Sequence, residues 1–123
     1  MSKLLKLEEA GQFLLSILLF SQLHYAWWIF PLFILLPDLS MLGYLFGTKT
    51  GAFFYNLFHH KFVGILVMAV GFWLGSQLLM LAGILLFGHS AMDRVLGYGL
   101  KYSDDFKHTH LGWIGKKEQV GAV

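Results

Sequence analysis

Two side chains near the end of the last apolar stretch have the types and the spacing of metal ligands. His89 and Asp93 lie four residues apart in the string GHSAMDR. On a helix, residues at this spacing share one face, so the imidazole and the carboxylate point to the same place. The paired histidines of an H-E-x-x-H helix hold a metal ion at this spacing. Taken alone, such a pair is more often structural, as a hydrogen bond that helps the helix end at the interface.

A second group of polar residues lies in the middle of the chain. Asn56 and His60 are four residues apart and would share a helical face, whereas His59 would point about 100° away from it. Each histidine is a candidate ligand. Asp38 follows Pro37 at the end of a long uncharged run. An isolated acid in that position would usually cap or end a helix.

The elements that must position these residues follow from the distribution of charge. The nine Lys and Arg and seven Asp and Glu residues lie in three short zones, which leaves residues 10–37 and 62–92 uncharged. Hydrophobic residues make up 57% of the chain, and its mean hydropathy is +0.65. An apolar run of about 18 residues or more is typical of a membrane helix. The pattern predicts an integral membrane protein, with the lipid bilayer as its expected partner.

Both uncharged stretches exceed the length of about 20 residues that one membrane crossing needs. Turn-tolerant polar residues interrupt each near its middle, at Ser21–His24 and at Gly75–Gln77. The sequence therefore predicts two helical hairpins in a single domain, residues 1–123. The expected fold is an all-α, four-helix membrane bundle with a short interfacial tail, residues 97–123. The expected helices cover residues 5–22, 25–42, 51–74 and 77–96.

In this arrangement both termini and the central connection lie on one side of the membrane, together with every Lys and Arg. The positive-inside rule makes that side cytoplasmic. The expected location is the plasma (inner) membrane. A two-span arrangement with long tilted helices is the alternative. The formal charge of +2 and the lack of a basic run argue against a nucleic-acid partner. The absence of cysteine excludes disulfides and thiolate metal sites.

Four spans would bring the candidate ligands to one depth at the cytoplasmic face. Ionisable groups in membrane segments are costly and by default indicate function. Carboxylates and imidazoles together suit Zn²⁺, Mn²⁺ or Fe²⁺. The expected ligands are Asp38, His59 or His60, His89 and Asp93. Such a metal would activate water and polarise a phosphoryl or acyl oxygen. This predicts a hydrolase acting on an amphiphilic or lipid-like substrate, with a phosphoester as one candidate.

Three further groups would assist that chemistry. Asn56 would orient a ligand or the substrate, and Arg94 would hold an anionic group. The tail contains His108 and His110, which would add a ligand or an acid–base group if the tail closed over the cluster. Without closure, the tail is a solvated segment that contacts lipid, since its aromatic and lysine side chains alternate as in interfacial segments.

Three long strings carry a family resemblance: PDLSMLGYLFG, GAFFYNLFHHK and GHSAMDRVLGYGLKYSDDFKHTHLG. They resemble the bacterial membrane proteins grouped as domain-of-unknown-function family 4260, which implies a small multi-helix membrane protein. A looser similarity concerns PD at 37–38, HH at 59–60 and the H-x-x-x-D motif at 89–93. These follow the motif order of the inner-membrane metal-dependent hydrolases. The second acid and histidine that usually follow PD are replaced here by LSM.

Two other functions use the same polar residues. One is a non-enzymatic small membrane protein, either a subunit of a larger complex or a proton or ion pathway along the His/Asp groups. The other is a haem protein with axial histidines on facing helices. Haem has no use for the neighbouring carboxylates, so the metal-dependent hydrolase is the favoured hypothesis.

Overall fold

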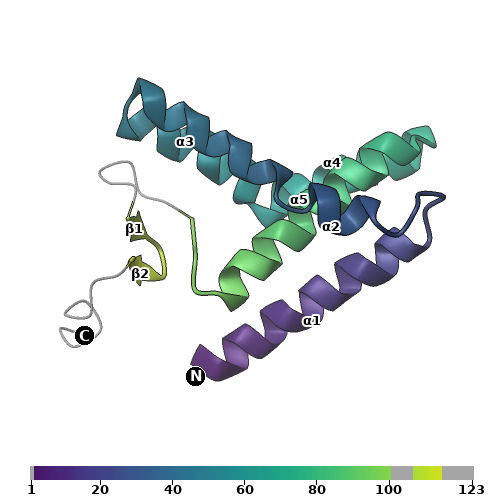
Figure 1. The fold of residues 1–123 in the computed structure, drawn as a ribbon, viewed down its shortest axis with the longest axis horizontal. Coiled ribbons are helices and arrows are strands. Elements are labelled where there is room, and N and C mark those ends of the chain that lie inside the picture. The colour runs from purple at the N-terminus through teal and green to yellow at the C-terminus, as the bar shows by residue number, and fades with distance from the viewer. Residues whose placement is uncertain (1, 101–106, 115–123) are drawn as a thin grey trace.

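The computed structural model describes residues 2–100 and 107–114, and it is built mainly of helices (Figure 1). The helices are α1 (Ser2–Ser21), α2 (Ile29–Phe33), a 3-10 helix η1 (Leu36–Phe46), α3 (Thr48–His59), α4 (Lys61–Leu74) and α5 (Gln77–Val95). The strands β1 (His108–Thr109) and β2 (Gly112–Trp113) form a small antiparallel pair, with His108 opposite Trp113. Apart from this pair of two-residue strands, the all-α class is confirmed.

Helices α1, α4 and α5 form the core of the fold. Helices α4 and α5 run antiparallel and are joined by a tight turn at Gly75, which has a φ of 67° that favours glycine. They approach so closely that a Cβ atom on Gly83 would lie 2.4 Å from the backbone nitrogen of Met68. Helix α1 packs against α5. The main cluster of buried apolar side chains comes from α1, α2, α5 and the residue after α2: Phe20, Phe30, Ile34, Leu81, Ile84 and Leu85.

The two ends of this core differ in charge. At one end, the backbone N–H of His24 donates to Oε1 of Gln77 over 3.0 Å, so the two uncharged turns lie together. Towards the other end, the Lys61 ammonium pairs with Glu9 and donates to Oε1 of Gln12 over 2.6 Å. The start of α4 is therefore fixed to the charged half of α1.

Helices η1 and α3 pack against each other and form an arm, residues 36–59. Figure 1 shows α3 pointing away from the hairpin of α4 and α5. Helices α3 and α4 are bent by 50° at a break, where the sequence predicted one helix over 51–74. The break lies at His60, whose backbone is extended and whose Nδ1 accepts the N–H of Phe62 over 3.2 Å. A side-chain cap of this kind stabilises a new helix start.

The helix expected over 25–42 is also interrupted. Helix α2 has only five residues, and η1 begins after a break at residues 34–35. Pro37 at the start of η1 explains the break, since it lacks the N–H that would continue the α-helical hydrogen bonding by donating to the carbonyl of Phe33. Hydrogen bonds of the 3-10 type then extend to Phe46.

Within residues 2–100 and 107–114, two segments are long and apolar enough to cross a membrane, Ile29–Phe46 and Gln77–Val95. The bent pair of α3 and α4 makes a third if it counts as one span. Helix α1 is not among them, since Lys3, Lys6, Glu8 and Glu9 occupy its first half. The described residues thus confirm apolar helices of membrane-spanning length, whereas the four-span bundle stays a prediction.

Candidate metal centre

Four ionisable side chains meet where the arm joins the core. They come from three elements: Asp38 from η1, His59 from the end of α3, and His89 and Asp93 from α5. One ligand atom from each residue lies within 4.8 Å of the other three. These four residues are called the His/Asp cluster below. Their convergence was expected from the sequence, and the cluster can hold a metal ion.

The distances inside the cluster are those of a metal site. Nε2 of His89 lies 2.9 Å from Oδ1 of Asp38 and 3.2 Å from Oδ2 of Asp93. Nε2 of His59 lies 3.3 Å from Oδ1 of Asp38 and 3.4 Å from Oδ2 of Asp93. Ligands placed tetrahedrally at the usual 2.0–2.1 Å from Zn²⁺ would lie about 3.3 Å from one another. The four nitrogen–oxygen separations agree with this value.

The backbone fixes the orientation of both imidazole rings. Nδ1–H of His59 donates to the carbonyl of Tyr55 over 2.8 Å, and Nδ1–H of His89 donates to the carbonyl of Ile34 over 2.6 Å. A carbonyl oxygen only accepts, so Nδ1 carries the proton in each ring. In the neutral form of each imidazole, the Nε2 lone pair is then directed into the cluster. Outer contacts of this kind orient histidine ligands in metal sites.

The cluster therefore brings together four atoms that can all accept a hydrogen bond. Two neutral imidazole nitrogens facing two carboxylate oxygens at 2.9–3.4 Å would repel one another without a positive charge between them. One divalent cation balances the two carboxylates. Protonation of both imidazoles would balance them as well. The geometry is compatible with either state.

The four side chains of the cluster are unequally buried, and the cluster is most exposed at Asp38. The exposed fraction of the side chain is 0% for His89, 4% for His59, 13% for Asp93 and 35% for Asp38. Charged groups removed from water must be paired or bound to a metal. Access for a small molecule is therefore from the side of Asp38.

Tyr55 was not singled out as a functional residue from the sequence, but it supports two members of the cluster. Its ring stacks on the imidazole of His59, with centroids 3.8 Å apart and planes 8° from parallel. Its side chain also hydrogen-bonds Asp93. The signal in the sequence was its position four residues before His59, on the same helical face.

Ser90 ties α5 to the end of α3. Its hydroxyl donates to the carbonyl of His59 over 2.8 Å and also lies 2.9 Å from the carbonyl of Leu86. Ser90 is buried, with 1% of its surface exposed. The last turn of α3, which carries His59, is thereby fixed against the helix that carries the other histidine.

The remaining central candidates lie outside the cluster. His60 is exposed and caps α4, so the structure brings His59 into the cluster and His60 away from it. Asn56 is half-buried on α3 and contributes no ligand atom. Arg94 is half-buried and lines a small void together with Tyr55, His59 and Asp93. Arg94 is thus placed beside the cluster.

The tail candidates lie farther along the chain. Nδ1 of His110 accepts the N–H of Leu100 over 2.7 Å, so this nitrogen is not directed at the cluster. Partial burial and the positive charge of Arg94 lower the pKa of His110 below its ordinary value. His108 belongs to β1, and its side chain lies outside the described part of the chain. The segment 98–100 lines the void beside His59 and Asp93.

Comparison with known proteins places the chain in a family. The model of a domain of unknown function, DUF4260, matches residues 2–114. The chain belongs to the DUF4260 family. No curated protein and no solved structure matches it. The family description states no activity, and the similarity to inner-membrane metal-dependent hydrolases stays a resemblance of motifs, so the function must be inferred from the cluster itself.

Proposed function

We propose that the His/Asp cluster binds one divalent metal ion and that this DUF4260 protein is a membrane-embedded metal-dependent hydrolase. One observation carries the proposal: two Nε2 atoms and two carboxylate oxygens face one another at 2.9–3.4 Å, and both Nδ1 protons are engaged by backbone carbonyls. Mixed nitrogen and oxygen ligation suits Zn²⁺, Mn²⁺ or Fe²⁺.

A bound divalent ion would lower the pKa of a coordinated water and polarise a phosphoryl or acyl oxygen. The side chains of the protein would do the rest. Asp38 is the most exposed member of the cluster and would border the opening through which substrate enters. Arg94 would hold an anionic group, and Asn56 would orient the substrate.

The reaction would be the hydrolysis of an ester. The oxygen of water forms a bond to phosphorus or to the acyl carbon while the bond to the ester oxygen breaks. One proton of the water ends on the leaving alcohol. Two buried imidazoles held by backbone carbonyls keep the polar groups in place, so little reorganisation accompanies the step.

The proposed substrate is lipid-like because the cluster lies among apolar helices. The proposed location is the plasma (inner) membrane, with the cluster and both termini on the cytoplasmic side in a four-span arrangement. Support comes from the charged half of α1, which contacts the start of α4 through Glu9 and Lys61. The two uncharged turns, which His24 and Gln77 connect, would lie on the opposite side.

The test is ester hydrolysis in mixed micelles by protein stripped of metal and then reloaded with Zn²⁺, Mn²⁺ or Fe²⁺. The substrates are an alkyl phosphodiester and a long-chain carboxylic ester. Reloading should restore cleavage, and Asp93→Asn should reduce it by about 1,000-fold or more. Glu8→Gln, an exposed acid on α1, is the matched control. Metal-loaded, folded protein that cleaves neither ester would overturn the enzyme assignment.

A second candidate is a non-enzymatic membrane protein in which the same cluster has a structural role. Four protein ligands would complete the coordination of Zn²⁺, and structural zinc sites are closed in this way. The metal would then fix the arm to the core. This candidate predicts thermal stabilisation by metal without ester cleavage. A proton or ion pathway would instead give conductance in liposomes that survives chelators.

A further inference from the structure

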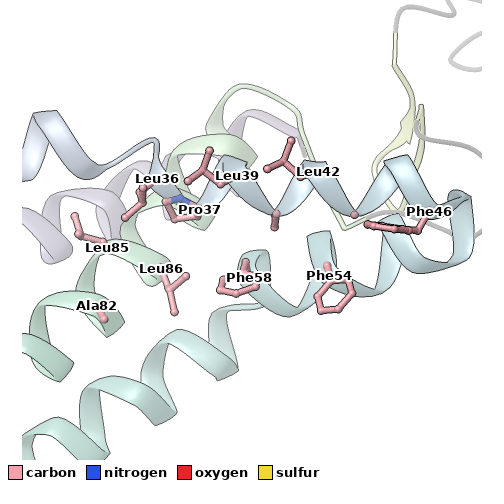
Figure 2. Close-up of a pocket in the computed structure, with 12 residues that line it drawn as sticks. Leu36, Pro37, Leu39, Leu42, Phe46, Phe54, Phe58, Ala82, Leu85 and Leu86 are labelled. Atoms are coloured by element: carbon pink, nitrogen blue, oxygen red, sulfur yellow. The ribbon is translucent and has the colours of Figure 1, made fainter.

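An apolar groove of about 620 Å³ lies between the arm and α5 (Figure 2). Each of three elements contributes apolar side chains to it. Typical ligand sites have volumes of about 300–1,000 Å³ and are mostly apolar. The side chains that line it include Leu39 and Leu42 of η1, Phe54 and Phe58 of α3, and Leu85 and Leu86 of α5.

The groove and the His/Asp cluster are built on the same three elements. Pro37 lines the groove and Asp38 belongs to the cluster, and the same relation holds for Phe58 and His59. On α5, Leu86 precedes His89 by three residues. Adjacent residues of an α-helix point about 100° apart. The groove therefore lies on faces of the helices that adjoin the cluster.

Ser40 points to a ligand in this groove. Among the described residues that line the groove, it alone has a polar side chain. Its hydroxyl oxygen is buried, and no partner reaches it within the part of the chain that the structure describes. A buried polar group without a partner is costly and requires an explanation. After rotation of the Ser40 side chain towards the groove, an oxygen atom of a bound molecule would give this hydroxyl its partner.

We propose that the groove binds the single alkyl or acyl chain of an amphiphile whose ester or phosphate group lies at the His/Asp cluster. The identity of the head group rests on the proposed function, whereas binding of the chain does not. Ser40 hydrogen-bonds an oxygen near the head of the chain. Arg94, beside the cluster, supplies a positive charge that complements an anionic head group.

A single chain fits this groove better than a helix of a partner protein does. A helix 10–12 Å across has a volume of about 500 Å³ per turn, so the groove would hold little more than one turn. A membrane-spanning helix needs about 20 residues. An alkyl chain needs no hydrogen-bond partners along its length, which suits a lining with one polar side chain.

The test is photo-crosslinking of the full-length protein in lipid nanodiscs. The probe is a hexadecyl phosphate that carries a diazirine near the middle of its chain, and labelled peptides are located by mass spectrometry. Labelling should be concentrated in residues 39–58 and 82–86. It should be saturable and displaced by unlabelled hexadecyl phosphate. Equal, non-saturable labelling of exposed Ile65 and Leu66 on α4 would overturn the proposal.

Matched variants make the test specific. Leu86→Trp fills the groove and should reduce labelling by about tenfold, since losing the burial of two methylene groups weakens binding by roughly that factor. Leu66→Trp, on the exposed surface of α4, should leave it unchanged. Ser40→Ala should weaken displacement by hexadecyl phosphate but preserve the fold. A Leu86→Trp protein that labels like the parent would contradict the proposal.

A further comparison distinguishes an incorrect assignment of the groove from an incorrect assignment of the metal site. Labelling is repeated with protein stripped of metal and with Asp93→Asn. Chain binding should persist in both, whereas ester cleavage should not. Disulfide-linked dimers of a Leu86→Cys variant, in a chain that otherwise lacks cysteine, would show that a second copy occupies the groove and would overturn binding of an alkyl chain.

Discussion

Nε2 of His89 lies 2.9 Å from Oδ1 of Asp38, although the two residues are 51 positions apart in the chain. This contact joins the start of the arm to the last turns of α5. His59, at the other end of the arm, meets the same carboxylate oxygen at 3.3 Å. Both ends of the arm thus meet at one point, so a cation bound in the cluster would also hold the arm against the core.

The two neighbouring histidines should respond differently to the same substitution. His59→Gln removes an Nε2 that lies within the cluster and should weaken metal binding by about 100-fold or more. His60→Gln changes an exposed helix cap and should leave metal affinity unchanged. The measurement is competition with a chromophoric chelator. Equal losses in both variants would contradict the assignment of His59 as the ligand.

The hydroxyl of Tyr55 should contribute to metal affinity through Asp93. Tyr55→Phe keeps the ring that stacks on His59 but removes the hydrogen bond to the carboxylate. Loss of such an outer contact should weaken metal binding by about 10–100-fold. The same chelator competition measures it, with Tyr25→Phe near the distant turn as the control. Unchanged affinity in Tyr55→Phe would mean that the hydroxyl does not support the site.

The ion pair between Glu9 and Lys61 should stabilise the packing of α1 against the core. Both side chains are more than four-fifths buried, and Lys61 also donates to Gln12. Glu9→Gln leaves a buried ammonium without its countercharge and should cost about 1–3 kcal/mol. Glu8→Gln, an exposed neighbour, is the control. Thermal unfolding in detergent should show a lower midpoint for Glu9→Gln alone.

The contact between His110 and segment 98–100 should weaken in acid. The folded pKa of His110 is lowered, so the stabilisation is present above the ordinary imidazole value of about 6.5 and is lost as the pH falls through the folded pKa. Protonation removes the lone pair that accepts the N–H of Leu100. Arg94 opposes this protonation and Glu9 favours it.

The measurement is the hydrogen-exchange protection of the Leu100 amide, corrected for intrinsic exchange, between pH 7.5 and 5. Protection should fall in the parent protein. His110→Asn keeps a hydrogen-bond acceptor but does not titrate, so its protection should not depend on pH. A parent protein with constant protection over this range would refute the role of His110.

Part of this structure follows directly from the sequence. The uncharged stretches predicted long apolar helices, and their polar interruptions predicted the turns after α1 and between α4 and α5. The i,i+4 spacing of His89 and Asp93 placed both on one face of α5. The prediction that Asp38 lies near His89 and Asp93 followed from assigning the charged zones to one end of the fold.

Other features depend on tertiary structure that no local pattern shows. The choice between His59 and His60 is decided by the break at His60, which turns two adjacent residues to different surroundings. The arm arises because Pro37 interrupts the helix expected over 25–42 and η1 then packs on α3. The groove is formed between this arm and α5, so the residues that line it could not be assigned from the sequence.

The most direct test of the central claim is metal analysis of the purified protein after exposure to Zn²⁺, Mn²⁺ and Fe²⁺. The predicted result is one divalent ion per chain in the parent protein, and none in His89→Ala or Asp93→Ala variants whose helicity is unchanged. A folded parent protein without metal under these conditions, or variants that keep the ion, would contradict the assignment of the His/Asp cluster as a metal centre.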